Sequence, residues 1–316
     1  MTEEQGPNDK PPELPPELAG FHLVFGTPRR LPKAAGLPGR VAVLDIAFAG
    51  EAGGRRNTFD KTTRKLIDAL GERLAAWVDH HDSAHHAEYR DDPRFTLATK
   101  AEHGACPEMI DEAVVTAAGR VDTIVCHTDF DGIVCAAKWI LGGREPYPGA
   151  DADARAVDTR IGLPSPRGAH LDRALRARPR DEATMLAVAQ ELVAPTPAAK
   201  AAIDAASADL EPREAEAARL ARGYRQLSDD LCLVDVGDGA PYDKTWLLLL
   251  GQQRAKMAAV VDGDTVTFAA PFDSGVDFLA AFGISGGMPT LVSIHRPRLR
   301  ESLAALGVDE AVAQQF

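Results

Sequence analysis

The sequence is short of cysteine and contains no long hydrophobic run. Its four cysteines form no Cys-x-x-Cys pair and no disulfide-like spacing, which suits a reducing compartment and small buried packing roles. The longest aliphatic run, Trp246 to Leu250, is far too short to span a bilayer, and the stretch from Met1 to Glu17 has no apolar core of signal-peptide length. We therefore expect a cytoplasmic protein with no membrane partner.

Positive charge is also in deficit. The chain has 35 Lys+Arg against 47 Asp+Glu, which gives a formal net charge of -12. Because nucleic acids are held largely by basic side chains on phosphates, this balance argues against long duplex nucleic acid as a partner. A small phosphate-bearing ligand, held by metal ions and local cations, fits better. We expect a small nucleotide or a short oligonucleotide, and the sequence leaves the oligomeric state open.

The length of the chain, 316 residues, exceeds the usual size of one hydrophobic core. Residues 1–19 combine five prolines with polar residues, which predicts a disordered leader. We expect a first α/β domain over residues 20–165, a helical connector over 166–230 and a smaller α/β domain over 231–316.

Short apolar segments alternate with helical patterns along the first domain. Strands are expected at residues 21–25, 41–48, 75–78, 123–126 and 154–157, and helices at 58–74, 108–118 and 133–141. This recurrence predicts a parallel α/β sheet. The connector shows two helix-like stretches around Pro195 and Pro197. The last domain has strand signals at 231–236, 257–261, 265–270 and 291–294, a hairpin turn at 262–264 and a helix at 276–282.

Two stretches concentrate imidazoles and carboxylates. Asp79-His80-His81 follows one expected strand, and the segment from His127 to Gly132 follows another. In an open parallel sheet the carboxyl ends of the strands share one edge, so these groups should converge there with Asp45 and Asp158. Crowded carboxylates raise each other's pKa, and divalent cations remove that conflict. The two stretches therefore predict one shared metal site.

Taken singly, each of these residues has an ordinary structural explanation. Asp45 alone is typical of a turn or cap residue, and His127 alone is typical of a satisfied core histidine; their joint occurrence is what favours a metal site. Several neighbours are expected to be simple exposed charges or packing residues. These are the cations Arg55, Arg56, Lys100 and Lys138, the imidazoles of His85 and His86, and the thiols of Cys126 and Cys135.

These residues carry a resemblance to a known family. Val78-Asp79-His80-His81 resembles the signature of the DHH phosphoesterase superfamily, and the segment from His127 to Gly132 is similar to the His-x-Asp-x-Asp-Gly motif of its RecJ-like branch. Asp45 and Asp158 resemble the isolated aspartates of the second and fourth motifs. The region from Leu231, with its Ser285-Gly286-Gly287 loop, resembles the accessory domain. The resemblance implies a DHH-type metal-binding domain over residues 20–165 and an accessory substrate-binding domain over 231–316.

The motif order departs from the family pattern, in which the His-x-Asp-x-Asp motif comes first and the DHH triplet third. Here Asp45 and the triplet precede it. A circularly permuted arrangement of strands would restore the same site, because the sheet edge is defined in space. The permutation leaves Asp235 as an alternative to Asp158. Met288 also stands where family members often carry a histidine.

The resemblance implies a two-ion centre and a set of roles. His127, Asp129 and Asp45 would hold one ion, and the other would be held by Asp131, Asp45, His80 and Asp158, with Asp45 as the bridge. His81 would contact the phosphate or leaving group, and Asp79 would orient a neighbouring imidazole. Substrate contacts are expected from Arg160, Gly286 and Gly287. A mixed oxygen and imidazole set suits Mn²⁺, with Mg²⁺ possible.

These expectations combine into a metal-dependent phosphoesterase. It would hydrolyse a phosphodiester or phosphoanhydride of a small nucleotide or short oligonucleotide by two-metal activation of water. The alternatives are a non-catalytic nucleotide-binding sensor and a RecJ-like single-strand exonuclease, which the acidic balance opposes. The site requires His80 and Asp131 to lie within ligand distance of a common ion.

Overall fold

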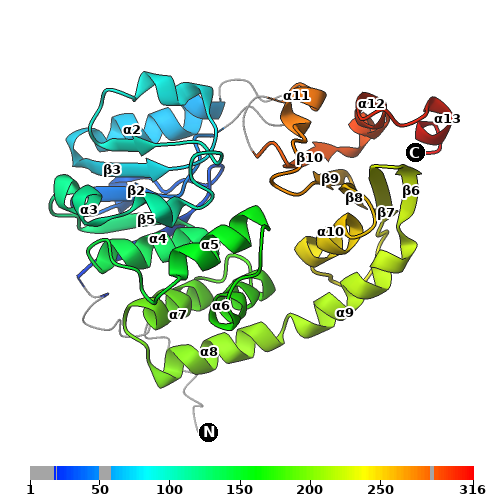
Figure 1. Cartoon of the computed structure of the whole chain (residues 1–316). Helices are drawn as coiled ribbons and strands as arrows, with labels where there is room; N and C mark the ends of the chain where they lie inside the picture. Colours follow the sequence, from blue (N-terminus) through cyan, green and yellow to red (C-terminus); the bar gives the residue numbers. More distant parts are fainter. Residues whose placement is uncertain (1–17, 19, 50–57, 285–287) are drawn as a thin grey trace, which may run out of the picture.

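The computed structural model describes residues 18, 20–49, 58–284 and 288–316. Most of the expected leader, the cations Arg55 and Arg56, and the glycines Gly286 and Gly287 lie outside the described residues. The described part folds into two five-stranded sheets, each with its own helices, connected by a run of helices along one side (Figure 1). The predicted α/β class, with a parallel sheet and a second, smaller α/β unit, is confirmed.

The first sheet is parallel throughout, with the strand order β1-β5-β2-β3-β4. Its strands are β1 (His22–Gly26), β2 (Val41–Leu44), β3 (Leu74–Asp79), β4 (Phe95–Leu97) and β5 (Thr123–His127). The chain returns from β4 to insert β5 between β1 and β2. The expected strand at 41–48 ends early, because Asp45 turns the backbone to a φ of 56°.

Both faces of the first sheet are buried, as near-continuous apolar strands require. Residues of β2 alternate between the faces. Ala42 and Leu44 pack on one face with α4 (Phe130–Ile140) and α3 (Glu112–Ala118) nearby. Val41 and Val43 pack on the other face, towards α2 (Lys65–Leu70). The period of two in the side chains therefore fixes which residues reach the helices and leaves the strand ends free for polar groups.

The strand expected at residues 154–157 is wrong, because these residues lie inside helix α5 (Ala150–Thr159). A short apolar run fits a strand and a buried helix segment equally, and its neighbours decide. Here Asp151 and Asp153 lie in the first turn, where the helix dipole favours negative charge. Asp158 consequently lies near the end of a helix and not at the end of a strand.

The connector contains more helix than the two expected stretches. Between residues 166 and 220, all of them described, the chain forms α6 (Pro166–Ala177), α7 (Glu182–Val193), α8 (Pro197–Ala208) and α9 (Glu211–Leu220). Side chains of Ser165, Asp181 and Thr196 cap the first three. Helices α6 to α8 share a hydrophobic cluster with α4 and α5, whereas α9 packs towards the second sheet. The domain boundaries stay a prediction.

The second sheet is mixed, with the order β10-β9-β8-β7-β6. Strands β7 and β8 run parallel and the other neighbours antiparallel. The strands are β6 (Arg225–Ser228), β7 (Leu231–Asp235), β8 (Met257–Asp262), β9 (Thr265–Ala269) and β10 (Leu291–His295). Gly263, at a φ of 54°, forms the expected hairpin turn between β8 and β9.

Helices cover both faces of the second sheet. Helix α10 (Lys244–Gln252) packs on one face with the end of α9. The other face is covered by α11 (Phe278–Phe282), α12 (Leu299–Ala305) and α13 (Glu310–Ala313). Among all the described residues, no helix has both the length and the apolar character needed to cross a bilayer.

Candidate metal centre

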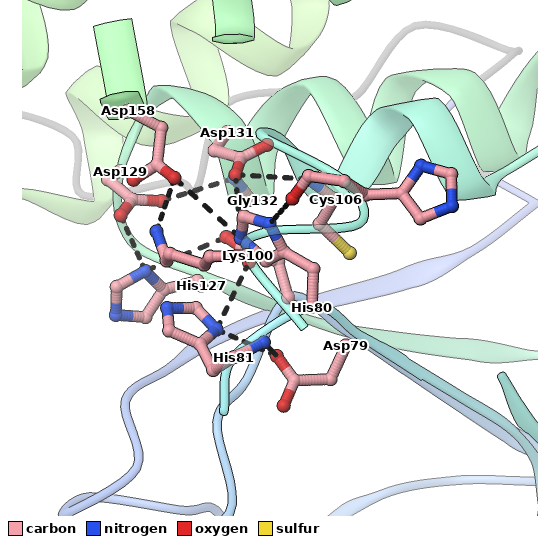
Figure 2. A network of polar contacts seen from close by, with 12 residues as sticks. Asp79, His80, His81, Lys100, Cys106, His127, Asp129, Asp131, Gly132 and Asp158 are labelled. Carbon is pink, nitrogen blue, oxygen red and sulfur yellow. Dashed lines mark hydrogen bonds and ion pairs between the residues drawn. The ribbon is translucent and has the colours of Figure 1, made fainter. Parts of the chain in front are cut away.

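The residues singled out in the two motifs come together at one edge of the first sheet (Figure 2). His127 ends β5, Asp45 follows β2, and Asp79-His80-His81 spans the end of β3. These three strands are direct neighbours in the order β5-β2-β3. The structure therefore brings these residues together at the carboxyl ends of neighbouring parallel strands.

Asp45 lies between the two motifs. Its side chain is 1% exposed, and its backbone adopts the left-handed region, which aspartate tolerates better than most residues. Its N–H donates to the carbonyl oxygen of Val78 at 2.8 Å, which ties the turn to the neighbouring strand. One carboxylate oxygen, Oδ1, lies 3.4 Å from Nε2 of His80, and the other, Oδ2, lies 3.8 Å from Nδ1 of His127. The carboxylate thus faces both halves of the cluster.

His80 is fully buried and held in one orientation. Its Nδ1 lies 2.9 Å from the carbonyl oxygen of His103, which can only accept, so the proton resides on Nδ1. Its Nε2 lies 3.3 Å from Oδ2 of Asp131 and 3.8 Å from Oδ2 of Asp158. The requirement that His80 and Asp131 face a common point is met.

The second motif forms the start of helix α4. Asp129 is the N-cap: its Oδ1 accepts from the N–H of Gly132 at 3.1 Å, while its Oδ2 lies 2.7 Å from Nδ1 of His127. Asp131 follows in the first turn and accepts the N–H of Cys106 at 3.2 Å. A Cβ on Gly132 would lie 2.6 Å from Cβ of His127, so only glycine fits at this position.

Asp79 lies behind the cluster and contacts two imidazoles. Its Oδ1 is 2.7 Å from Nδ1 of His81, and its Oδ2 is 3.7 Å from Nε2 of His86. Burial alone would raise the pKa of Asp79, but His81 lowers it below its usual value. His86 was expected to be an exposed neighbour, yet it reaches Asp79. Its position in a short 3-10 helix, three residues past Ser83, gave no signal of this contact.

The electrostatics of the cluster are those of crowded acids and bases. Burial, reinforced by the charge of Asp131, raises the pKa of Asp45 well above its usual value. Burial also raises the pKa of Asp131. Burial opposes protonation of His80, but Asp131 and Asp45 outweigh it and raise its pKa to about 12. The charge of Asp129 likewise outweighs burial and raises the pKa of His127 to about 9. Protons, or cations, are needed to balance these groups.

The donor set fits divalent cations. Among the buried side-chain atoms of the described residues, Asp45 Oδ1, His80 Nε2 and Asp131 Oδ1 have no hydrogen-bond partner, although buried polar atoms are normally paired. Three groups have ligand atoms within 4.8 Å of one another: Asp45-His127-Asp129, His80-Asp131-Asp158 and Asp45-His80-His81. Carboxylate and imidazole ligands suit a divalent metal such as Mn²⁺. Asp45 belongs to two of these three groups.

Two lysines differ from expectation. Lys100 and Lys138 were expected to be exposed, but they are only 2% and 4% exposed. Lys100 forms an ion pair with Asp158, and Lys138 pairs with Asp151 at 2.6 Å. Both lysines are covered by packing between segments distant in sequence, which local composition does not reveal. The expected burial of the cysteines is confirmed for all four, which lie in the described part.

The two candidates for the fourth-motif aspartate differ in position. Asp158 faces His80 from the end of α5. Asp235 ends β7 in the second sheet and forms an ion pair with Arg296 at 2.8 Å. Of the two, Asp158 is the one that joins the cluster.

A cavity of about 460 Å³ opens between this cluster and the second sheet. The expected substrate contact Arg160 lines it, beside His81 and Lys100. The opposite wall is mainly apolar and comes from α10 and the second sheet. It consists of Thr245, Leu248, Leu249, Gln252, Ala269, Ala270, Met288, Thr290 and Leu291. Sequence analysis missed Arg29, which also lines the cavity and follows β1 as the site residues follow their strands.

Comparisons with known proteins give little independent support. No protein-family model matches the chain, and no curated protein matches it in sequence. Among solved structures, the chain is similar to PggH, a pGpG-specific phosphodiesterase from Vibrio cholerae, with a TM-score of 0.39 and 11% identity. The match covers 86% of this chain and 100% of that one. A likeness this weak does not bear on the function of this chain.

Proposed function

We propose that the protein is a metal-dependent phosphoesterase of DHH type, which hydrolyses a phosphodiester or phosphoanhydride of a small nucleotide or short oligonucleotide. One observation carries the proposal: the buried carboxylate of Asp45 lies between two groups of unsatisfied ligands at the edge of a cavity. A structural carboxylate would have its own hydrogen-bond partners.

The chain supplies ligands for two ions, with Mn²⁺ favoured and Mg²⁺ as the alternative. Asp45, His127 and Asp129 would hold one ion, and Asp45 would share the other with His80, Asp131 and Asp158. When bound, such ions lower the pKa of water and stabilise charge on the oxygens of a phosphoryl group. The carbonyl oxygen of His103 keeps Nε2 of His80 free to act as a ligand.

His81 has a separate role in this proposal. Its Nδ1 is bonded to the buried carboxylate of Asp79, which leaves Nε2 for the phosphate or leaving group. Because Asp79 holds the ring in place, His81 is positioned to act as the proton donor to a departing oxygen. His81 lines the cavity in which such a contact would be made.

The cavity supports a small substrate. Its volume, about 460 Å³, falls within the range of sites for small molecules. Arg29 and Arg160 provide positive charge for phosphate oxygens, and the apolar wall of α10 and the second sheet suits a base. The assignment of residues 231–316 as the substrate-binding domain, and of Gly286 and Gly287 as contacts, is part of this proposal.

A turnover assay with the full chain tests the function. The protein, stripped with EDTA and reloaded with Mn²⁺, is given bis-p-nitrophenyl phosphate, linear dinucleotides including pGpG, cyclic dinucleotides and short single strands. We expect Mn²⁺-dependent hydrolysis and its loss in Asp131→Ala. The control Asp111→Ala alters a helix cap outside the cluster and should retain turnover. Unchanged activity in Asp131→Ala would refute the assignment, and nucleotide binding without turnover would favour a sensor.

A further inference from the structure

Lys100 is a buried cation inside the cluster. Its ammonium group forms an ion pair with Oδ2 of Asp158, and Figure 2 shows it pointing towards that carboxylate. The same oxygen of Asp158 lies 3.8 Å from Nε2 of His80. A lysine buried to this degree is rare unless it is paired. Lys100 therefore contacts an oxygen of a carboxylate that also belongs to the ligand group His80-Asp131-Asp158.

The turn that carries Lys100 is held by hydrogen bonds and is tied to the site. The N–H and hydroxyl of Thr99 both donate to Oε2 of Glu102, at 2.8 and 2.9 Å. The N–H of Ala98 donates to the carbonyl oxygen of Asp79 at 3.0 Å. The carbonyl oxygen of His103, at the end of the turn, accepts from Nδ1 of His80. The turn thus places Lys100 and orients a metal ligand together.

The two ligand groups are unequal because of this lysine. The group Asp45-His127-Asp129 has no lysine ion pair among the described contacts, whereas the group His80-Asp131-Asp158 has Lys100 on one of its carboxylates. The charges that face Lys100 are Asp158, Asp131 and Asp45. An ion that uses Asp158 must displace this ammonium or accept its repulsion.

We infer that Lys100 is a built-in competitor of the second metal ion, which makes the centre bind one ion tightly and the other weakly. The inference rests on the proposed two-ion function. Lys100 also lines the cavity, so an ammonium released from Asp158 has substrate space beside it. Filling the second position then requires a higher free metal concentration than filling the first.

Metal titration tests the inference without an activity assay. The full chain, stripped with EDTA, is titrated with Mn²⁺ by calorimetry, and free Mn²⁺ is followed by electron paramagnetic resonance. We expect two steps in the wild type, the second weaker by about tenfold or more, and a second step at least about tenfold tighter in Lys100→Met. Lys138→Met, which removes another buried and paired lysine outside the cluster, is the matched control and should match the wild type.

Other outcomes decide against the inference. An unchanged second step in Lys100→Met overturns it. A second step weaker by roughly 10- to 100-fold also overturns it, because Lys100 would then orient Asp158 for the ion. Two equal steps in both proteins overturn it but leave the proposed function intact, whereas an absence of Mn²⁺ binding in the wild type refutes the function itself.

A second variant keeps the inference testable if Lys100→Met does not fold. Lys100→Gln removes the charge but keeps a polar donor. It should also tighten the binding of the second Mn²⁺ ion, so it replaces Lys100→Met if that variant fails to fold. Asp158→Asn should weaken the second step, and adding Lys100→Gln to it should then change little, because the competition acts through Asp158. An equal gain from Lys100→Gln with and without Asp158 contradicts the mechanism.

Discussion

Both sheets carry acidic residues at the ends of their strands, but the partners of these residues differ between the sheets. In the second sheet Asp235 pairs with Arg296, and Asp262 accepts from the hydroxyl of Tyr242 at 2.8 Å and pairs with Lys244 at 3.1 Å. In the first sheet Asp45 is buried and faces ligand atoms that have no hydrogen-bond partners. A strand-end acid by itself therefore does not mark the site, whereas a buried acid that faces unpaired ligand atoms does.

Neutralising one strand-end acid in each sheet gives the largest expected contrast. Asp45→Asn keeps the shape and tolerates the left-handed backbone but removes the shared charge, so we expect turnover to fall roughly a thousandfold or more, about 4 kcal/mol in the barrier. Asp235→Asn removes one partner of an exposed ion pair and should leave turnover unchanged. Steady-state kinetics on both variants measures the contrast.

The metal-free stability of these variants sharpens the same comparison. Asp45→Asn should not destabilise the metal-free protein, because burial and the charge of Asp131 disfavour an ionised carboxylate at this position. Thermal unfolding with EDTA checks this. Comparable turnover losses in Asp45→Asn and Asp235→Asn would break the distinction between the sheets.

Metal binding by the first sheet should depend on pH. The pKa values of His127, about 9, and His80, about 12, are raised, so both imidazoles are in the positively charged form at pH 7 in the metal-free protein. A metal ligand must be neutral, so Mn²⁺ binding releases protons, and affinity should rise as the pH increases from 7 towards 9, by up to about tenfold per unit for each proton released.

Calorimetry in buffers of different ionisation enthalpy counts these protons. Asp235→Asn should show the same release as the wild type, and His127→Gln should show less. Mn²⁺ binding that is independent of pH over this range would contradict the assignment of the imidazoles as ligands.

The smallest expected effect separates positioning from metal binding. Asp79→Asn removes the carboxylate that holds His81, so we expect turnover to fall about 10- to 100-fold with Mn²⁺ binding nearly unchanged. Its counterpart in the second sheet, Asp262→Asn, should leave turnover within about twofold, since a half-exposed ion pair contributes little. Parallel kinetics and Mn²⁺ titrations test this, and a matching loss of Mn²⁺ affinity in Asp79→Asn would contradict a role through His81.

Much of the site followed from local pattern. Apolar runs that end in Asp79-His80-His81 and in His127 predicted adjacent strand ends, and the parallel order β5-β2-β3 brings them together. Local pattern failed for Asp158, because a short alanine-rich run does not distinguish a strand from a helix. It also failed for Lys100, whose partner Asp158 lies far away in sequence, and for His86, whose contact with Asp79 the local spacing did not indicate.

The sequence by itself determined the ligand chemistry, the parallel class of the first sheet and the convergence of its strand ends, because these depend on residue type and on the period of two along a strand. The tertiary structure alone decided the insertion of β5 between β1 and β2, the placement of Asp158 by α5 and the cavity beneath α10. It also decided that Lys100 lies inside the cluster. These features depend on how distant helices pack together, and packing sums many weak contacts that no local stretch contains.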